Sequence, residues 1–125
     1  SLTRQTFRSN DLTGGYAGVL RQTSAGCSTP ASNATVESVV GVAITNSLTA
    51  LTMTTNESGT ICDYVGNYRQ SGRMGSSTGT FSCPGRTGTY EMLEIEANPS
   101  GVTGRITGRS NVCSQISGRL AIVKR

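Results

Sequence analysis

Short segments in which Val, Ile, Leu and Tyr alternate with Ser, Thr and charged residues recur along the whole chain, and they constrain the fold more than any other feature. An apolar residue at every second position is the pattern of a β-strand with one buried face. No window shows sustained apolar residues at the i, i+3, i+4, i+7 spacing of an amphipathic helix, and 16 glycines interrupt any long helix. The chain is therefore predicted to be all-β.

The spacing of the segments predicts the architecture. Strands are expected at residues 14–23, 36–46, 48–56, 61–70, 75–83, 87–97, 102–110 and 115–124. All three prolines fall in connections, where the missing N–H costs no ladder hydrogen bond. These features predict an eight-stranded antiparallel up-and-down barrel over residues 13–125, with a β-sandwich as the alternative. Residues 1–12 are predicted to be a polar N-terminal tether.

One hairpin is predicted at residues 71–74, because glycine at position 72 fits the first central position of a two-residue type II′ turn. Counting outward from this turn opposes Gly66 and Gly79, Tyr64 and Phe81, and Cys62 and Cys83. Directly opposed residues lie about 4.5–5.5 Å apart at Cα, within the range that a disulfide tolerates.

A second hairpin is predicted at residues 98–101, with Pro and Gly where a type I turn prefers them. Counting outward opposes Ala97 and Val102, Ile95 and Gly104, and Leu93 and Ile106, with Glu94 opposite Arg105 and Tyr90 opposite Arg109 on the other face. This register points Glu91 into the barrel beside Gly108. There Glu91 would be a polar anchor in a ligand cavity or, alternatively, a rim residue open to water.

Four cysteines are expected to form two disulfides. Hydrophobic content is only 34%, so the core is lean, and small secreted domains of this kind often carry disulfides. Buried free thiols or a metal site are the alternatives. In an up-and-down meander the connections after strands 1, 3, 5 and 7 share one rim, and the cysteines lie at these connections. A closed sheet favours Cys62–Cys83 with Cys27–Cys113, ahead of Cys27–Cys62 with Cys83–Cys113 and the crossed pairing.

The cysteine usage predicts an oxidising compartment, so we expect an exported protein, either periplasmic, anchored to the outer membrane as a lipoprotein, or secreted. No stretch approaches the roughly 20 apolar residues of a membrane-spanning helix. The polar tether is expected to follow a removed export signal, and a lipidated cysteine upstream would make the native protein a lipoprotein.

Composition argues against catalysis and against nucleic acid as a partner. The chain has no histidine, which removes the usual general base, the usual metal ligand and every Ser–His or Cys–His arrangement. No glycine-rich nucleotide loop is present. Catalytic residues, metals and cofactors are therefore not expected. Ten arginines and one lysine give a net charge of +4 without a basic cluster, so we expect either a scattered basic surface or attraction to an acidic partner.

Two short motifs resemble those of small secreted barrels of the calycin type, the lipocalins and avidins. They are residues 14–18, Gly-Gly-Tyr-Ala-Gly, in the first strand and residues 117–120, Ser-Gly-Arg-Leu, in the last. Those families usually place tryptophan in the first motif, where this chain has Tyr16. The resemblance implies the barrel architecture and assigns no residue roles.

The predicted function is that of an exported, non-catalytic binding or interaction module, bacterial in origin, that uses the rim carrying the cysteines. Arg86 and Arg109 are expected near that rim, where they would attract an acidic group, and Tyr64 and Glu91 are further candidate binding residues. The expected partner is a protein or a small acidic or apolar ligand. The alternative is an inhibitor of a lysozyme or a protease that acts through loop 24–35, anchored by Cys27.

Overall fold

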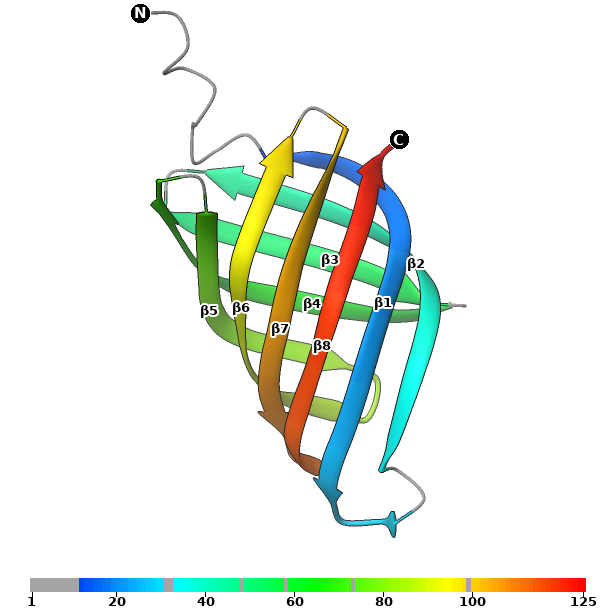
Figure 1. Ribbon diagram of the computed structural model, residues 1–125. Coiled ribbons are helices and arrows are strands. Elements are labelled where there is room, and N and C mark those ends of the chain that lie inside the picture. The colour runs from blue at the N-terminus through cyan, green and yellow to red at the C-terminus, as the bar shows by residue number, and fades with distance from the viewer. Residues whose placement is uncertain (1–11, 31–32, 48, 58, 73, 99) are drawn as a thin grey trace, which may run out of the picture.

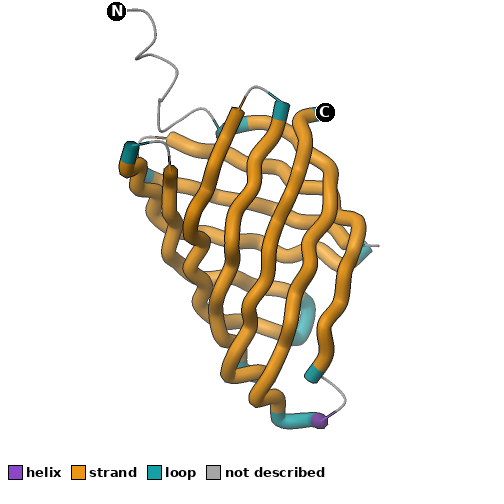
Figure 2. The backbone as a smooth tube through the Cα atoms, in the orientation of Figure 1, coloured by secondary structure: helices purple, strands orange, loops and turns teal. Residues whose placement is uncertain are grey.

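The computed structural model describes residues 12–30, 33–47, 49–57, 59–72, 74–98 and 100–125. They form a closed barrel of eight antiparallel strands in sequence order, with β8 pairing back onto β1 (Figure 1, Figure 2). The strands are β1 Gly14–Cys27, β2 Ala34–Ser47, β3 Ala50–Glu57, β4 Thr60–Ser71, β5 Met74–Cys83, β6 Arg86–Asn98, β7 Gly101–Ser110 and β8 Cys113–Lys124. In Figure 1, β6, β7, β8 and β1 cover the near side and β3 and β4 cross the far side.

This barrel confirms the predicted fold and excludes the sandwich. All eight predicted strands are present, and most extend past their predicted ends. The largest extension is at the end of β1, which continues to Cys27 through Ser24, Ala25 and Gly26. The strand continues because β8 pairs with β1 as far as Cys113, and the ladder outweighs weak local strand propensity, although Gly26 has φ 64°.

The β4–β5 hairpin has the predicted register, with Gly66 opposite Gly79 and Tyr64 opposite Phe81. Gly72 has φ 61°, as the first central position of a primed turn requires. The Gly66–Gly79 pair faces the interior, where a Cβ on Gly79 would lie 2.0 Å from the carbonyl oxygen of Val65. Glycine is therefore required at both positions of this pair, where a Cβ would clash with the backbone of the neighbouring strand.

The β6–β7 register differs from the prediction because β6 contains a bulge. Ala97 faces Val102 as predicted, but the pairing shifts between Leu93 and Glu96, and Glu94 has φ 53°. The extra residue in β6 reverses the facing of every residue before it.

Because of the bulge, three predicted positions are wrong. Leu93 lies opposite Arg105, Tyr90 opposite Gly108 and Glu91 opposite Thr107, and Met92 is the residue opposite Ile106. Tyr90 is therefore buried in the barrel, and Glu91, predicted to point inward, is exposed on the outer face. Glu94 and Arg105, which were predicted to face each other, form an ion pair at 3.4 Å between exposed side chains.

Both favoured disulfides are present. Cys27 is bonded to Cys113 and Cys62 to Cys83, with Cα–Cα distances of 3.8 and 4.3 Å. All four cysteines lie at one end of the barrel, which we call the cysteine rim. Two disulfides are compatible with an exported protein. Among the described residues, no helix is long and apolar enough to cross a membrane.

The opposite end, the closed rim, carries the β2–β3, β4–β5 and β6–β7 connections and is filled by side chains. Leu12 is only 3% exposed and packs in the core, and its carbonyl oxygen accepts a 2.7 Å hydrogen bond from the Tyr16 hydroxyl. Thr13 bonds to the backbone of Asn46. The core thus begins one residue before the predicted domain, while residues 1–11 of the predicted tether lie outside the described residues.

Candidate functional site

The cysteine rim holds a cavity that opens into a groove, and we call the two together the mouth. The inner cavity, of about 30 Å³, is lined by Tyr64, Phe81 and Tyr90 and by both cysteines of the Cys62–Cys83 disulfide. The outer groove, of about 350 Å³, lies along the inner faces of β1 and β2. Gln22, Glu57 and Arg86 line both, so a single opening leads from solvent to the aromatic core.

Strand alternation places the polar residues of the mouth. Glu57 ends β3 and continues the inward series of Leu51, Met53 and Thr55, all of which are buried. Arg86 begins β6 two residues before Gly88, on the same face as buried Tyr90. The inward faces of β3 and β6 therefore each have a charged residue just where the barrel opens.

Four polar side chains in the mouth are available to a ligand. Glu57, Arg86, Gln22 and Tyr64 are all half-buried. Within the described part of the chain, none of these side chains has a hydrogen bond or an ion pair. Convergent polar groups without intramolecular partners, set at the edge of an apolar interior, are the usual composition of a binding pocket.

The electrostatics of the mouth centre on Tyr64. Its ring stacks on Phe81 at 5.6 Å and meets Tyr90 edge-on at 5.2 Å. Burial, with a smaller contribution from the charge of Glu57, raises the pKa of Tyr64 to about 12, against an opposing effect of Arg86. The Tyr64 phenol therefore stays protonated at neutral pH and can donate a hydrogen bond beside the Arg86 guanidinium.

One wall of the mouth is a strand with a free edge. β2 pairs with β1 from Ala34 onward but with β3 only from Gly41 onward. Figure 1 shows this part of β2 running beside β1 with no strand on its other side. Val36 faces inward and lines the groove, yet it is 54% exposed because no strand lies across from it.

The structure brings two of the four predicted binding residues together. Tyr64 and Arg86 both line the inner cavity. Arg109 lies near the cysteine rim but is exposed on the outer face of β7, opposite Thr89. Glu57 and Gln22 were not predicted as binding residues. The inward alternation that ends at Glu57 was the signal that could have found it.

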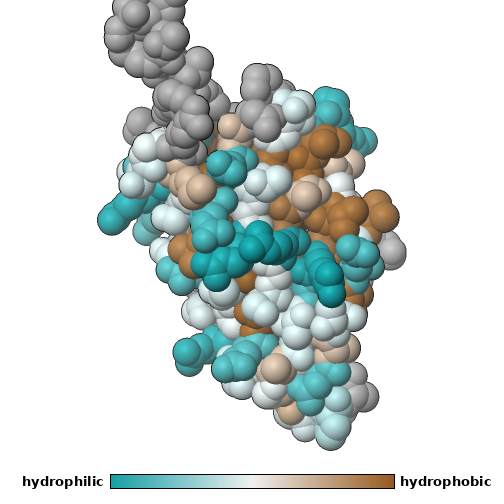
Figure 3. All heavy atoms as spheres, in the orientation of Figure 1, coloured by the Kyte–Doolittle hydropathy of each residue, from teal (hydrophilic) through white to brown (hydrophobic). Residues whose placement is uncertain are grey.

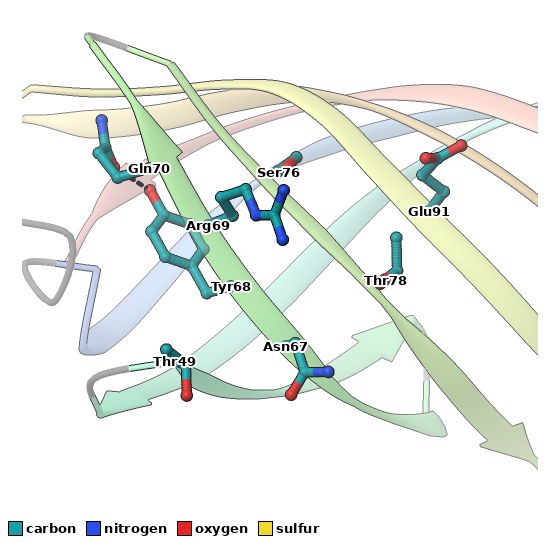
Figure 4. A pocket seen from close by; sticks show the side chains of 8 residues that line it. All are labelled: Thr49, Asn67, Tyr68, Arg69, Gln70, Ser76, Thr78 and Glu91. Carbon is teal, nitrogen blue, oxygen red and sulfur yellow. Dashed lines mark hydrogen bonds between the residues drawn. The ribbon is translucent and has the colours of Figure 1, made fainter.

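Glu91 lines a separate hollow of about 860 Å³ on the outside of β4, β5 and β6, shown in Figure 4. Arg69 and Glu91 are its charged residues, and both are exposed to solvent. The Tyr68 hydroxyl is already hydrogen-bonded to Gln70. This hollow is wide and open, so its charges are screened more strongly than those of the half-buried mouth.

A band of hydrophilic residues crosses the outer face in Figure 3, beside a more apolar area. Cross-strand pairing aligns Arg105, Arg119 and Arg21 on β7, β8 and β1, and Glu37 follows on β2. Glu37 lies at one end of this row of arginines, and Glu94 forms an ion pair with Arg105 at the other end. The row therefore carries little net charge. It is a weaker candidate than the mouth.

The mouth offers hydrogen bonding and charge of both signs. No group of three or more Cys, Asp or Glu residues that could hold a metal ion occurs in the described parts of the chain. Comparison of the chain with models of protein families, with curated proteins and with solved structures gives no match. The function is therefore argued from the geometry of the mouth.

Proposed function

We propose that this protein is a non-catalytic binding module whose contact surface is the mouth at the cysteine rim. The observation that carries the proposal is a set of half-buried polar side chains that line the mouth and have no hydrogen bond or ion pair with a described residue, namely Glu57, Arg86, Gln22 and Tyr64. Elsewhere in the barrel, the inward side chains fill the interior and pack against each other. The mouth is thus the part of the interior that remains open to a partner.

The disulfides favour binding at this end. Cys62 and Cys83 line the inner cavity, and Cys27–Cys113 joins β1 to β8 where the barrel opens. A surface fixed by covalent links loses little conformational entropy when a partner binds, so more of the contact energy appears as affinity. The same disulfides support our proposal that the protein is exported, in the periplasm or as a lipid-anchored protein of a bacterium.

The charges of the mouth predict the chemistry of the partner. Arg86 and the Tyr64 hydroxyl are neighbouring donors for an acidic group, and charge-assisted hydrogen bonds of this kind are stronger than neutral ones. Glu57 can accept a hydrogen bond from the same partner. Binding should weaken as salt is added, because the charges remain partly accessible to ions.

The experiment that tests this proposal is a pull-down with matched charge reversals. Biotinylated protein captures partners from a periplasmic extract, and Arg86→Glu and Arg109→Glu are compared with Arg69→Glu on the outside of the barrel. We expect Arg86→Glu to abolish capture, Arg109→Glu to weaken it, and Arg69→Glu to leave it unchanged. Capture that is the same in all variants and independent of salt would exclude the mouth. Turnover of any substrate would contradict the non-catalytic assignment.

Inhibition of a lysozyme or a protease is a second candidate function, and the loop after β1 favours it. The Cys27–Cys113 disulfide, a 2.8 Å bond from Ser28 N to Val112 O and a 3.1 Å bond from Cys27 N to Asn33 Oδ1 hold the described ends of this loop. A constrained loop suits insertion into an active site. Inhibition of lysozyme or of a serine protease that is lost when residues 29–32 are replaced by glycines would favour this candidate.

A further inference from the structure

We infer that the mouth takes an extended segment of a partner polypeptide, which pairs with residues 34–40 of β2 as an additional strand and places an acidic side chain between Arg86 and the Tyr64 hydroxyl. This inference rests on the proposed function and deepens it by naming the class of partner. It depends on the free edge of β2, on the groove along its inner face and on the charge of the mouth.

The free edge can accept a strand. Residues 34–40 pair with β1 on one side, and no described residue pairs with them on the other. In an antiparallel ladder, alternate residues point N–H and C=O groups to opposite sides, so part of this stretch presents unpaired groups to solvent. Its sequence, ATVESVV, has no proline and is rich in β-branched residues, and Val39 is 78% exposed. Natural sheets usually cover or charge such edges, or use them to bind an extended peptide.

The groove can accept the side chains of an added strand. Alternate side chains of that strand would face inward, into the 350 Å³ between the inner face of the β1–β2 pair and the side chains of Glu57 and Arg86. Val36 is 54% exposed there although it faces inward, so an inserted side chain would bury it. A bound strand would thus complete both the backbone ladder and the interior packing at this end.

The charges select an acidic side chain at one inward position. Arg86 and Tyr64 both line the inner cavity, Arg86 also lines the groove, and neither side chain has a hydrogen bond or an ion pair with a described residue. A carboxylate at this point would receive two hydrogen bonds. Glu57, which lines the same cavity and groove, is suited to a hydroxyl or amide donor on the next inward residue.

A second copy of this chain is a poorer occupant than another polypeptide. Antiparallel pairing of residues 34–40 with the same residues of a second molecule, in full overlap, puts Glu37 opposite Glu37. Directly opposed like charges destabilise a strand pair. Glu37 therefore acts against self-pairing along the full edge.

A designed peptide tests the inference directly. The probe is a capped, fluorescein-labelled heptapeptide in which threonine alternates with valine and the central residue is glutamate. A second probe has lysine at the centre. Two further probes carry N-methyl groups on alternate backbone nitrogens, one on the even positions and the other on the odd positions. Binding is measured by fluorescence anisotropy with the wild-type protein, with Arg86→Gln, and with Arg69→Gln as the control.

We expect the glutamate probe to bind about tenfold more tightly than the lysine probe, because a charge-assisted hydrogen bond is worth on the order of one factor of ten. Arg86→Gln should reduce this difference to within about twofold, and Arg69→Gln should leave it unchanged. One of the two N-methyl sets should abolish binding while the other has little effect, because a strand bonds to one edge through alternate residues. Amide exchange in residues 34–40 should slow when the glutamate probe binds.

Three results would overturn the inference. The first is that the glutamate probe does not bind at millimolar concentration, and the second is that the two N-methylated probes bind with equal affinity. The third is that the free protein is a dimer that the probe dissociates, which would make a second copy the occupant. Failure of the inference is distinguishable from failure of the proposed function. A partner captured in an Arg86-dependent manner that leaves amide exchange at β2 unchanged would keep the mouth as the binding surface and exclude strand addition.

Discussion

The two ends of this barrel differ in the inward-facing side chains at the ends of their strands. At the closed rim, the inward positions hold Leu12, Tyr16 and Tyr68, which are buried and fill the opening. At the cysteine rim, the corresponding inward positions hold Glu57 and Arg86, which are only half-buried. One alternating pattern builds both ends. The residues at the strand ends, together with the free edge of β2, therefore determine which end is sealed and which stays open.

The two ends are also held together by different forces. The closed rim is stabilised by burial and by hydrogen bonds such as those between Thr13 and Asn46. The cysteine rim has half-buried Glu57 and Arg86 at its inward positions, and it carries both disulfides. A covalent link constrains the unfolded chain as well as the folded one, so it stabilises an end of the barrel without filling it. The cysteine rim can therefore stay open without a loss of stability.

The largest expected effects come from the disulfides. Cys27 and Cys113 are 86 residues apart and Cys62 and Cys83 are 21 apart. The chain-entropy relation gives losses of about 4.6 and about 3.4 kcal/mol, respectively, when each pair is replaced by serine. Guanidinium unfolding followed by circular dichroism should therefore rank the Cys27→Ser, Cys113→Ser double variant as the less stable of the two. The reverse order would show that native contacts, rather than loop length, decide the contribution of each disulfide.

Truncation of one apolar side chain at each end tests the difference in packing. Leu12 is 3% exposed at the closed rim, so Leu12→Ala should cost about 2–3 kcal/mol through lost burial and the cavity left behind. Val36 is 54% exposed in the mouth, so Val36→Ala should change stability by less than about 0.5 kcal/mol. Urea unfolding measures both. Similar losses in the two variants would contradict the view that the cysteine rim is the open end.

Most of the fold was predictable from the sequence because its signals are local. Alternation gave the eight strands, and the turn at 71–74 gave the register that opposes Tyr64 and Phe81. Closure of the sheet then brought Cys27 to Cys113. Each of these steps depends on counting residues from a turn or a strand end, and the periodicity of two is strict.

The candidate site was only partly predictable, because a single extra residue in a strand reverses the direction in which the side chains before it face. The bulge at Glu94 carries no sequence signal such as a glycine at the position of positive φ, so Glu91 was predicted to point inward when it points outward. The free edge of β2 was also missed. Strand lengths on either side of a staggered barrel mouth depend on the shear of the whole sheet, which no single hairpin reveals.

Tyr64 makes the stability of the open end sensitive to alkaline pH. Its raised pKa, about 12, means that the folded protein keeps a proton that the unfolded chain releases above about pH 10. Stability therefore falls as the pH rises between 10 and 12, by about 1.4 kcal/mol per pH unit from this group. Tyr64→Phe should remove this part of the decline and leave stability at pH 7 almost unchanged. Denaturant unfolding at pH 9 and pH 11 measures the difference, and equal declines in both proteins would rule out Tyr64 as the cause.

The smallest expected effect is on stability when the charges of the mouth are removed. Arg86 has no ion pair among the described residues, so Arg86→Gln should alter the free energy of unfolding by less than about 0.5 kcal/mol. The electrostatic effect should appear at Tyr64 instead. Arg86→Gln removes a cation that favours the phenolate and should raise the pKa of Tyr64, whereas Glu57→Gln removes an anion and should lower it. Titration of the Tyr64 ring by NMR measures both shifts. Opposite shifts at unchanged stability are expected of charges that serve a partner rather than the fold, and a large loss of stability in either variant would show that the mouth is closed by contacts of its own.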